Sequence, residues 1–119
     1  MRFQQLMLYV ATSAQGLLVG FATAGPQNQA GVASVYSTES GSGTASGQKL
    51  NPHGLTAAHP SLPFGTKVRV TNKSNGRSVL VTINDRGPFV RGRVIDVTPA
   101  AAAKLGFSGL AQVTLSVGN

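Results

Sequence analysis

The stretch that decides the fold is residues 66–83, which read TKVRVTNKSNGRSVLVTI. Valines alternate with polar or basic residues on both sides of a short polar segment, which is the period-2 pattern of half-buried β-strands. Between the two runs lies the pair Asn75 and Gly76, whose residue types tolerate the positive φ angles of a hairpin turn. The pattern therefore predicts strands at Thr66–Thr71 and Ser78–Ile83, joined by a tight turn.

Three further strands are predicted outside the hairpin, because each stretch is rich in β-branched or apolar residues at alternate positions. They are Ala30–Tyr36, Arg93–Val97 and Ala111–Val117. Residues 37–47 are nearly all Ser, Thr and Gly, so we expect them to form a loop. Short strands that follow one another in this way favour a small closed barrel, which leaves no long unpaired edge.

A short helix is predicted directly after Thr98. Thr98 is a typical N-cap, Pro99 suits the first helical position, and four alanines follow. Lys104 falls in the last turn, and Gly106 is a typical helix stop. These signals together predict a helix of about two turns.

The first 24 residues differ from the rest of the chain. Arg2 gives a positive start, residues 6–24 are uncharged and mainly apolar, and the segment ends in Ala-Thr-Ala. This layout is typical of a secretory signal peptide with cleavage after Ala24. The alternative is a membrane anchor, although Ser, Gln and two glycines make the segment less apolar than a typical span. We expect residues 25–30 to be a polar linker and residues 31–117 to form the folded domain.

Charge and cysteine content narrow the function classes. The chain has no cysteine, so neither a disulfide framework, a thiol nucleophile nor a lipid-modified cysteine is available. The formal net charge of +7 favours an anionic partner. Nucleic acid is the usual partner of a strongly basic domain, but an exported protein meets wall polymers and lipid head groups first, and charge can also serve solubility alone. We expect no nucleic acid partner, and a monomer without a membrane anchor after signal cleavage.

Only three carboxylates remain after such cleavage, and they limit the possible acid chemistry. A standard glycoside hydrolase needs two carboxylates that face each other across the scissile bond. Asp85 follows a strand and precedes a Gly-Pro turn, so we expect its side chain at an edge open to substrate, although an Asp there can also bond its own turn. Asp96 lies within a strand and is expected to be buried against a hydrogen-bonding partner or Arg93. Glu39, in the Ser-rich loop, is expected to be solvated.

Histidines and aromatic residues are few. His53 and His59 have no third ligand nearby, so no metal or other cofactor is expected. The ring of His59 is instead expected to bond to a loop carbonyl or to substrate. Phe64 and Phe89 stand beside glycine or proline in loops, where their rings can contact a sugar. Phe107 lies just past the helix and is expected in the core.

Four segments carry a resemblance to a known family. They are LTAAH at 55–59, LPFGT at 62–66, NDRGPF at 84–89 and RGRVID at 91–96. In this order and spacing they closely resemble rare lipoprotein A, and the resemblance runs through residues 31–117. It implies a mainly β fold, a six-stranded double-psi β-barrel with one or two short helices, shared in outline with expansins and some lytic transglycosylases.

The resemblance also implies a secreted or periplasmic protein that acts on the glycan strands of peptidoglycan. Some family members cleave the bond between N-acetylmuramic acid (MurNAc) and N-acetylglucosamine (GlcNAc) without water and leave a 1,6-anhydro ring. One carboxylic acid suffices, because it can protonate the leaving oxygen and then accept the proton of the C6 hydroxyl. The matching acid is Asp85, and His59 falls at the histidine of the family pattern. The substrate-binding residues expected beside them are Tyr36, Phe64, Arg86, Phe89 and Arg91.

The chain departs from the family at Gln48, where active members carry a glutamate. A glutamine cannot transfer a proton, so Gln48 retains only a positioning role in catalysis. Two hypotheses follow. The favoured one is an endolytic lytic transglycosylase that works through Asp85, and the alternative is a non-catalytic, expansin-like module that binds peptidoglycan.

Overall fold

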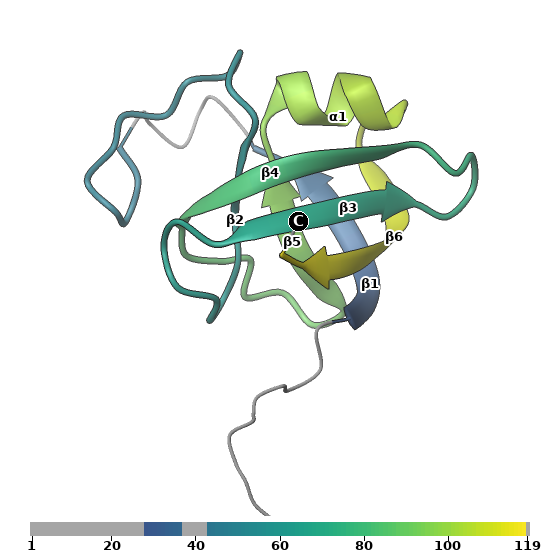
Figure 1. Ribbon diagram of the computed structural model, residues 1–119, viewed down its shortest axis with the longest axis horizontal. Helices are drawn as coiled ribbons and strands as arrows, with labels where there is room; N and C mark the ends of the chain where they lie inside the picture. The colour runs from purple at the N-terminus through teal and green to yellow at the C-terminus, as the bar shows by residue number, and fades with distance from the viewer. Residues whose placement is uncertain (1–27, 37–42, 119) are drawn as a thin grey trace, which may run out of the picture.

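The computed structural model describes residues 28–36 and 43–118, which form a closed six-stranded β-barrel with one short helix (Figure 1). The strands are β1 (Asn28–Val35), β2 (Thr56–Ala58), β3 (Lys67–Asn72), β4 (Ser78–Asp85), β5 (Arg93–Val97) and β6 (Leu110–Val117), and the helix is α1 (Pro99–Leu105). The predicted signal peptide, the first residues of the predicted linker and Glu39 lie outside the described residues.

The strands close in the order β1-β5-β2-β4-β3-β6. The pairs β1/β5 and β2/β4 are parallel, whereas the four other neighbouring pairs are antiparallel. Strands that follow one another in sequence are therefore mostly not neighbours in the barrel. This interleaving brings the ends of β1, β2 and β4 together at one edge, and the candidate site forms there.

The hairpin is present with the predicted alternation. Val68 and Val70 of β3 and Val79 and Val81 of β4 are buried, while the residues between them face outward. The turn between the strands is five residues long, and Gly76 adopts a positive φ of 77°. The barrel interior is filled by these valines, by Ile83 of β4 and by apolar side chains from the other strands and α1, namely Ala33, Ala57, Ile95, Val97, Ala101, Ala102, Leu105, Val113 and Leu115. Phe107 packs against this core, as predicted.

Two features of the barrel differ from the sequence-based expectation. Residues 28–30, predicted as linker, are the first residues of β1 and pair with β6. Strand β2 was not predicted, because its three residues include two alanines and carry no alternating pattern. It is a strand because it fits between β4 and β5, which supply its hydrogen bonds.

Helix α1 has the predicted caps. The Thr98 hydroxyl accepts a hydrogen bond from the backbone N–H of Ala101, and Gly106 ends the helix with a φ of 78°. A side chain at Gly106 would also collide with Arg77, whose Nη1 lies 2.7 Å from the position of a Cβ atom. Within residues 28–36 and 43–118, no helix has the length and apolar character needed to cross a membrane.

Candidate functional site

The candidate site is built around the Asp85 carboxylate at the end of β4. Its Oδ2 atom accepts a hydrogen bond of 2.9 Å from the Tyr36 hydroxyl. Its Oδ1 atom accepts two bonds of 2.8 Å, from the backbone N–H groups of Ala45 and Arg86. The side chain is half-buried. Asp85 does bond its own turn, through Arg86, but its two other donors come from distant parts of the chain.

Besides its own turn, two other segments of the chain position this carboxylate. Tyr36 directly follows β1, and its backbone N–H donates to the carbonyl of Val97 in β5. Residues 43–50 form a loop beside the end of β4 (Figure 1). This loop is attached to β4 by a hydrogen bond from the Ser46 N–H to the Asn84 carbonyl, and it is closed by a β-bridge between Gly43 and Lys49.

Gln48 and Asn84 form a second polar pair next to Asp85. The Asn84 side-chain amide donates to Oε1 of Gln48 at 3.1 Å. Asn84 is 4% exposed, and its Oδ1 atom has no partner among the described residues. A buried acceptor without a partner costs free energy, and an ordered water can satisfy an acceptor in this position. Asn84 was not predicted as a site residue, because outward-facing strand positions are usually solvated. The loop that covers Asn84 cannot be recognised in the sequence.

The Tyr36 hydroxyl keeps its proton and can therefore always donate a hydrogen bond. Burial, together with the hydrogen bond to Asp85 and the negative charge of that carboxylate, raises the pKa of Tyr36 far above its ordinary value. Tyr36 therefore remains protonated throughout the physiological range. The two backbone donors on Oδ1 cannot turn away, whereas the Tyr36 hydroxyl can rotate. Oδ2 is consequently the oxygen of Asp85 whose hydrogen-bond partner can change.

His59 lies near Asp85 in the backbone but its ring faces elsewhere. Its N–H donates to the Asp85 carbonyl at 3.1 Å. The ring Nδ1 atom accepts bonds of 3.1 Å from the N–H groups of Ser61 and Leu62, and Nε2 lies 3.0 Å from Oε1 of Gln29. Nδ1 therefore carries no proton, and Nε2–H donates to Gln29. The predicted bond to a loop carbonyl is not present, because the ring accepts from two loop N–H groups and bonds to the Gln29 side chain of β1 instead, and the ring does not bond to Asp85.

We expect His59 to make the stability of the barrel depend on pH. Burial, and secondarily the positive charge of Arg86, lowers the pKa of His59. An unfolded histidine gains a proton below about pH 6.5, where the folded protein still holds His59 neutral. The unfolded state then binds more protons, so stability is full above that pH and is lost as the pH falls through it. Urea unfolding between pH 7.5 and pH 5.5 measures this loss.

His59→Asn is expected to reduce the pH dependence, because an asparagine oxygen can accept the same two N–H bonds without titrating. The exposed His53 provides the matched control, and His53→Asn is expected to leave the dependence unchanged. If His59→Asn retains the full loss of stability at low pH, the assignment of His59 as a neutral acceptor is wrong.

Arg86 and Phe64 form a clamp beside the site. The guanidinium of Arg86 donates to the carbonyls of Leu62 and His59, and it lies 4.1 Å from the centre of the Phe64 ring. This geometry is a cation–π contact. Both interactions hold the loop from His59 to Phe64 against the end of β4. Arg86 therefore has a structural role in addition to any contact with substrate.

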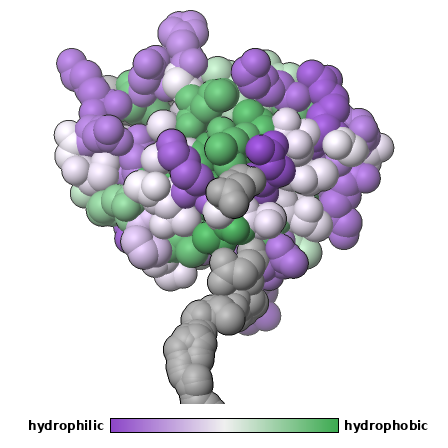
Figure 2. Space-filling view, in the orientation of Figure 1, coloured by the Kyte–Doolittle hydropathy of each residue, from purple (hydrophilic) through white to green (hydrophobic). Residues whose placement is uncertain are grey.

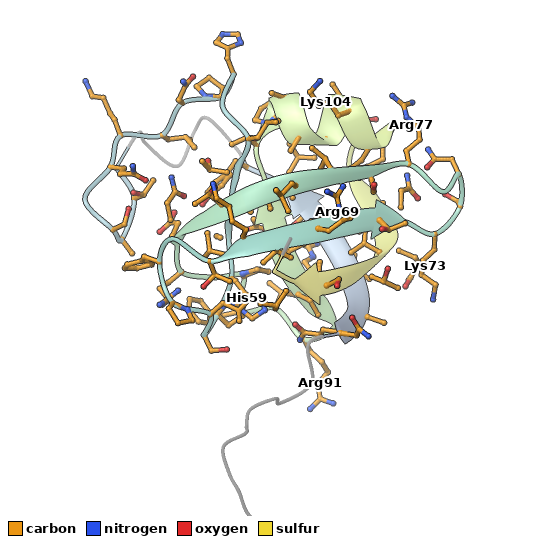
Figure 3. All side chains as sticks on the ribbon, in the orientation of Figure 1. His59, Arg69, Lys73, Arg77, Arg91 and Lys104 are labelled. Atoms are coloured by element: carbon orange, nitrogen blue, oxygen red, sulfur yellow. The ribbon has the colours of Figure 1, made fainter. Side chains whose placement is uncertain are left out.

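Phe89 and Arg91 lie on the loop between β4 and β5. Phe89 is 79% exposed and Val90 is 54% exposed, which is high for large apolar side chains. Arg91 is exposed and projects from the end of the barrel opposite to α1 (Figure 3). Exposed aromatic and basic side chains on a loop are typical of ligand contacts. Neither residue bonds to Asp85, so the structure does not bring them into the carboxylate site itself.

The other predicted acid, Asp96, lies near this site but has a different hydrogen-bond partner: Asp85 and Asp96 pair with Ala58 from opposite sides, and the negative charge of Asp96 also contributes to raising the pKa of Tyr36. Asp96 lies in β5, and its Oδ1 atom accepts a hydrogen bond from the Ser34 hydroxyl of the neighbouring strand β1. The alternative partner, Arg93, is three residues away in the same strand, and a bulge between the two puts both on the side that faces away from the barrel interior, paired with Val32 and Ser34. Within the part of the chain that the structure describes, no three His, Cys, Asp or Glu side chains are close enough to hold a metal ion.

A pocket of about 290 Å³ lies beside His59 rather than beside Asp85. Polar and aliphatic side chains both line it, and the lining residues are Asn28, Gln29, His59, Ser61, Leu62, Leu115 and Val117. The carboxylate site is therefore an open edge of the barrel and is separate from this pocket.

The family is decided by a comparison with family models. The model described as lytic transglycolase matches residues 28–115, a range that includes both Asp85 and the loop with Gln48. The chain belongs to this family.

Curated relatives agree with the lytic transglycolase assignment. The chain is 58% identical over 92 residues to the probable endolytic peptidoglycan transglycosylase RlpA of Nostoc sp.. It is 52% identical over 93 residues to the endolytic peptidoglycan transglycosylase RlpA of Yersinia pestis, and 48% identical over 89 residues to that of Escherichia coli K12. These matches cover 73–76% of this chain and 25–26% of the relatives. The chain thus spans about a quarter of their length.

Two solved structures show the same fold. The Streptomyces papain inhibitor has a TM-score of 0.63 at 24% identity, with 78% of this chain and 96% of that chain covered. The apo expansin of Clavibacter michiganensis has a TM-score of 0.61 at 19% identity, with 77% and 50% covered. At these identities the likeness establishes the fold alone. Together with the family match, it confirms the predicted RlpA-like double-psi β-barrel.

Proposed function

We propose that this domain is an endolytic lytic transglycosylase that cuts peptidoglycan glycan strands between MurNAc and GlcNAc and leaves 1,6-anhydro ends. Family membership and the names of the curated relatives support the reaction class. The observation that carries the proposal is the Asp85 carboxylate, which three donors hold at an open edge of the barrel. A carboxyl group fixed in this way is suited to proton transfer, because its orientation costs no further entropy when substrate binds.

The proposed reaction uses one acid. Asp85, protonated on Oδ2, donates its proton to the glycosidic oxygen while the bond from that oxygen to C1 of MurNAc breaks. The C6 hydroxyl oxygen of the same MurNAc forms a bond to C1, and its proton passes to the Asp85 carboxylate. The new C1–O6 bond closes the anhydro ring, no water is consumed, and Asp85 ends as it began.

The neighbouring residues have distinct proposed roles. Tyr36 orients Oδ2, and Gln48 with Asn84 positions the substrate through amide hydrogen bonds. Phe64, Arg86, Phe89 and Arg91 contact the flanking sugars. His59 is a positioning residue, because its ring organises the loop that Arg86 and Phe64 clamp and does not reach Asp85.

The second candidate is a non-catalytic module that binds peptidoglycan in the same place. Gln48 favours it, because this residue stands where active family members are expected to carry a proton-transferring glutamate. The deciding experiment incubates the purified protein with isolated glycan strands and searches the products for anhydro-MurNAc ends by mass spectrometry. New anhydro ends support the enzyme, whereas strand binding without new ends supports the module.

Export to the cell wall is the location that this function requires. The proposed signal peptide at residues 1–24 supports it. N-terminal sequencing of the protein from the wall fraction is expected to begin at Gly25. A product that retains Met1 in the membrane fraction contradicts cleavage.

A further inference from the structure

A group of cations is gathered on one side of the barrel, away from Asp85. We call it the cationic face, and its residues are Lys67, Arg69, Lys73, Arg77 and Lys104, all exposed. Figure 3 shows Arg69, Lys73, Arg77 and Lys104 on β3, the β3–β4 turn and the end of α1, whereas His59 and Arg91 lie at the opposite end. The positive charge of the protein is therefore concentrated rather than evenly spread.

The neighbouring strands add no negative charge to this face. The outward residues that pair with Lys67 and Arg69 are Thr82 and Leu80 of β4 and Ser116 of β6, all uncharged. The two carboxylates among the described residues lie elsewhere, Asp85 at the far end of β4 and Asp96 in β5. Because no carboxylate of residues 28–36 and 43–118 lies beside these cations, their charges remain available to an external anion.

Hydrogen bonds orient the side chains of Lys67 and Arg69 but use only some of their N–H donors. The Lys67 ammonium donates to the Thr82 hydroxyl at 2.7 Å, and the Arg69 guanidinium donates to the Ser78 hydroxyl at 3.3 Å. Lysine has three side-chain donors and arginine has five, so most remain free for phosphate oxygens. The bonds to β4 also reduce the entropy lost when a ligand orders these side chains.

The shape of the cationic face favours a surface over a single polymer strand. The three pockets described in the barrel are lined by other residues, and the five cations all lie on exposed parts of the surface. Figure 2 shows hydrophobic side chains near the middle of this view, with hydrophilic ones around them. Leu80 of β4, which pairs with Arg69, is half-buried and adds apolar surface beside that cation. Cations around a modest apolar centre are typical of proteins that lie on anionic membranes.

We propose that the cationic face binds reversibly to a lipid surface rich in anionic phosphate head groups. This inference goes beyond the proposed function and uses none of its site residues. Strand β4 connects the two regions: Ser78 at its start contacts Arg69, Thr82 contacts Lys67, and Asp85 lies at its end, roughly 10 Å beyond Thr82 along an extended strand. Ser78, beside the β3–β4 turn, is roughly 23 Å from Asp85 on the same measure. A protein docked through the part of the face at this turn and α1 therefore leaves the Asp85 edge open to glycan strands.

The test compares binding of the full chain to vesicles of phosphatidylcholine with and without phosphatidylglycerol, measured by co-sedimentation at low salt. The uncharged segment 6–24 contributes to both vesicle types, so the measured quantity is the ratio between them. Each cation near an anionic membrane contributes roughly a fivefold gain in partitioning. The triple variant Lys67→Gln, Arg69→Gln, Lys73→Gln is therefore expected to lower this ratio by about a hundredfold. Arg77 is left in place because it donates to the Ala103 carbonyl at the end of α1.

A second triple variant, Lys49→Gln, Arg91→Gln, Arg93→Gln, removes the same charge from other parts of the barrel. It is expected to change the ratio far less, and circular dichroism checks that both variants fold. An equal loss in the two variants means that net charge alone attracts the protein and overturns the proposal. So does an absence of preference for anionic vesicles. A loss of binding to lipid-free sacculi, with vesicle binding intact, would assign the face to a wall polymer instead.

Discussion

Asp85→Asn is expected to reduce the formation of anhydro-MurNAc ends by about 10² to 10⁴, the range that loss of general acid–base help typically costs. Asparagine preserves the shape of the side chain, and its Oδ1 atom can still accept from the N–H groups of Ala45 and Arg86. The Tyr36 hydroxyl can turn to accept from the new amide. The fold and glycan binding should therefore survive, so that the loss lies in the rate of the chemical step.

The rate is measured by mass spectrometry of anhydro ends against time, and glycan binding by co-sedimentation with sacculi. Asp96→Asn is the matched control, because it also removes one carboxylate but keeps an acceptor for Ser34. It is expected to leave the rate unchanged. A wild-type rate in Asp85→Asn contradicts the single-acid mechanism. If the natural protein binds glycan strands but produces no anhydro ends at all, the binding module is the correct function.

Gln48→Glu distinguishes the two candidate functions. If the chain is a binding module derived from an enzyme, cleavage is expected to appear or to rise at least about tenfold, because a second proton-transferring group then stands next to Asp85. If the chain is already a single-acid enzyme, the rate is expected to change little. A glutamate oxygen can accept from the Asn84 amide as the Gln48 oxygen does, so the new carboxylate should occupy the same place. The second carboxylate oxygen then faces the substrate in place of an amide donor. The same mass-spectrometric assay gives the rate.

Lys49→Glu tests whether the new negative charge must stand at position 48 or acts from any nearby position. Lys49 is the next residue and is exposed, and it pairs through its backbone with Gly43 rather than with Asn84. We expect no gain from it. An unchanged rate in Gln48→Glu would mean that Asp85 alone is the complete acid–base machinery, and a gain in both variants would point to a general charge effect. If Gln48→Glu creates activity in an inactive natural protein, this chain is a binding module derived from an enzyme.

Two kinds of sequence signal predicted structure well, and both are local. The alternation of valines in residues 66–83 identified β3 and β4 and the face of each that is buried, because a strand places neighbouring side chains on opposite sides. The cap residues Thr98 and Gly106 identified the two ends of α1, because each satisfies a helix terminus through its own backbone or side chain. Neither signal depends on distant parts of the chain.

The site was only partly predictable. Asp85 was expected at an edge because it follows a strand and precedes a Gly-Pro turn, and the structure places it at the end of β4. The role of Asn84 was not expected, because its burial comes from a loop almost forty residues earlier in the sequence. The ring of His59 lies close to Gln29 and not to Asp85. The parallel pairing of β2 with β4 and the turn that follows β2 determine this orientation.

By itself, the sequence determined the β-hairpin, the capped helix, the absence of thiol chemistry and, through its resemblance to a family, the barrel type and the candidate acid. Only the tertiary structure decided that β2 is a strand, that Tyr36 donates to Asp85, and that the cations of β3 and α1 share one face. The physical reason is the range of the interactions. Alternation and capping act between residues a few positions apart, whereas the barrel interleaves its strands and sets side by side groups that are separated by dozens of residues.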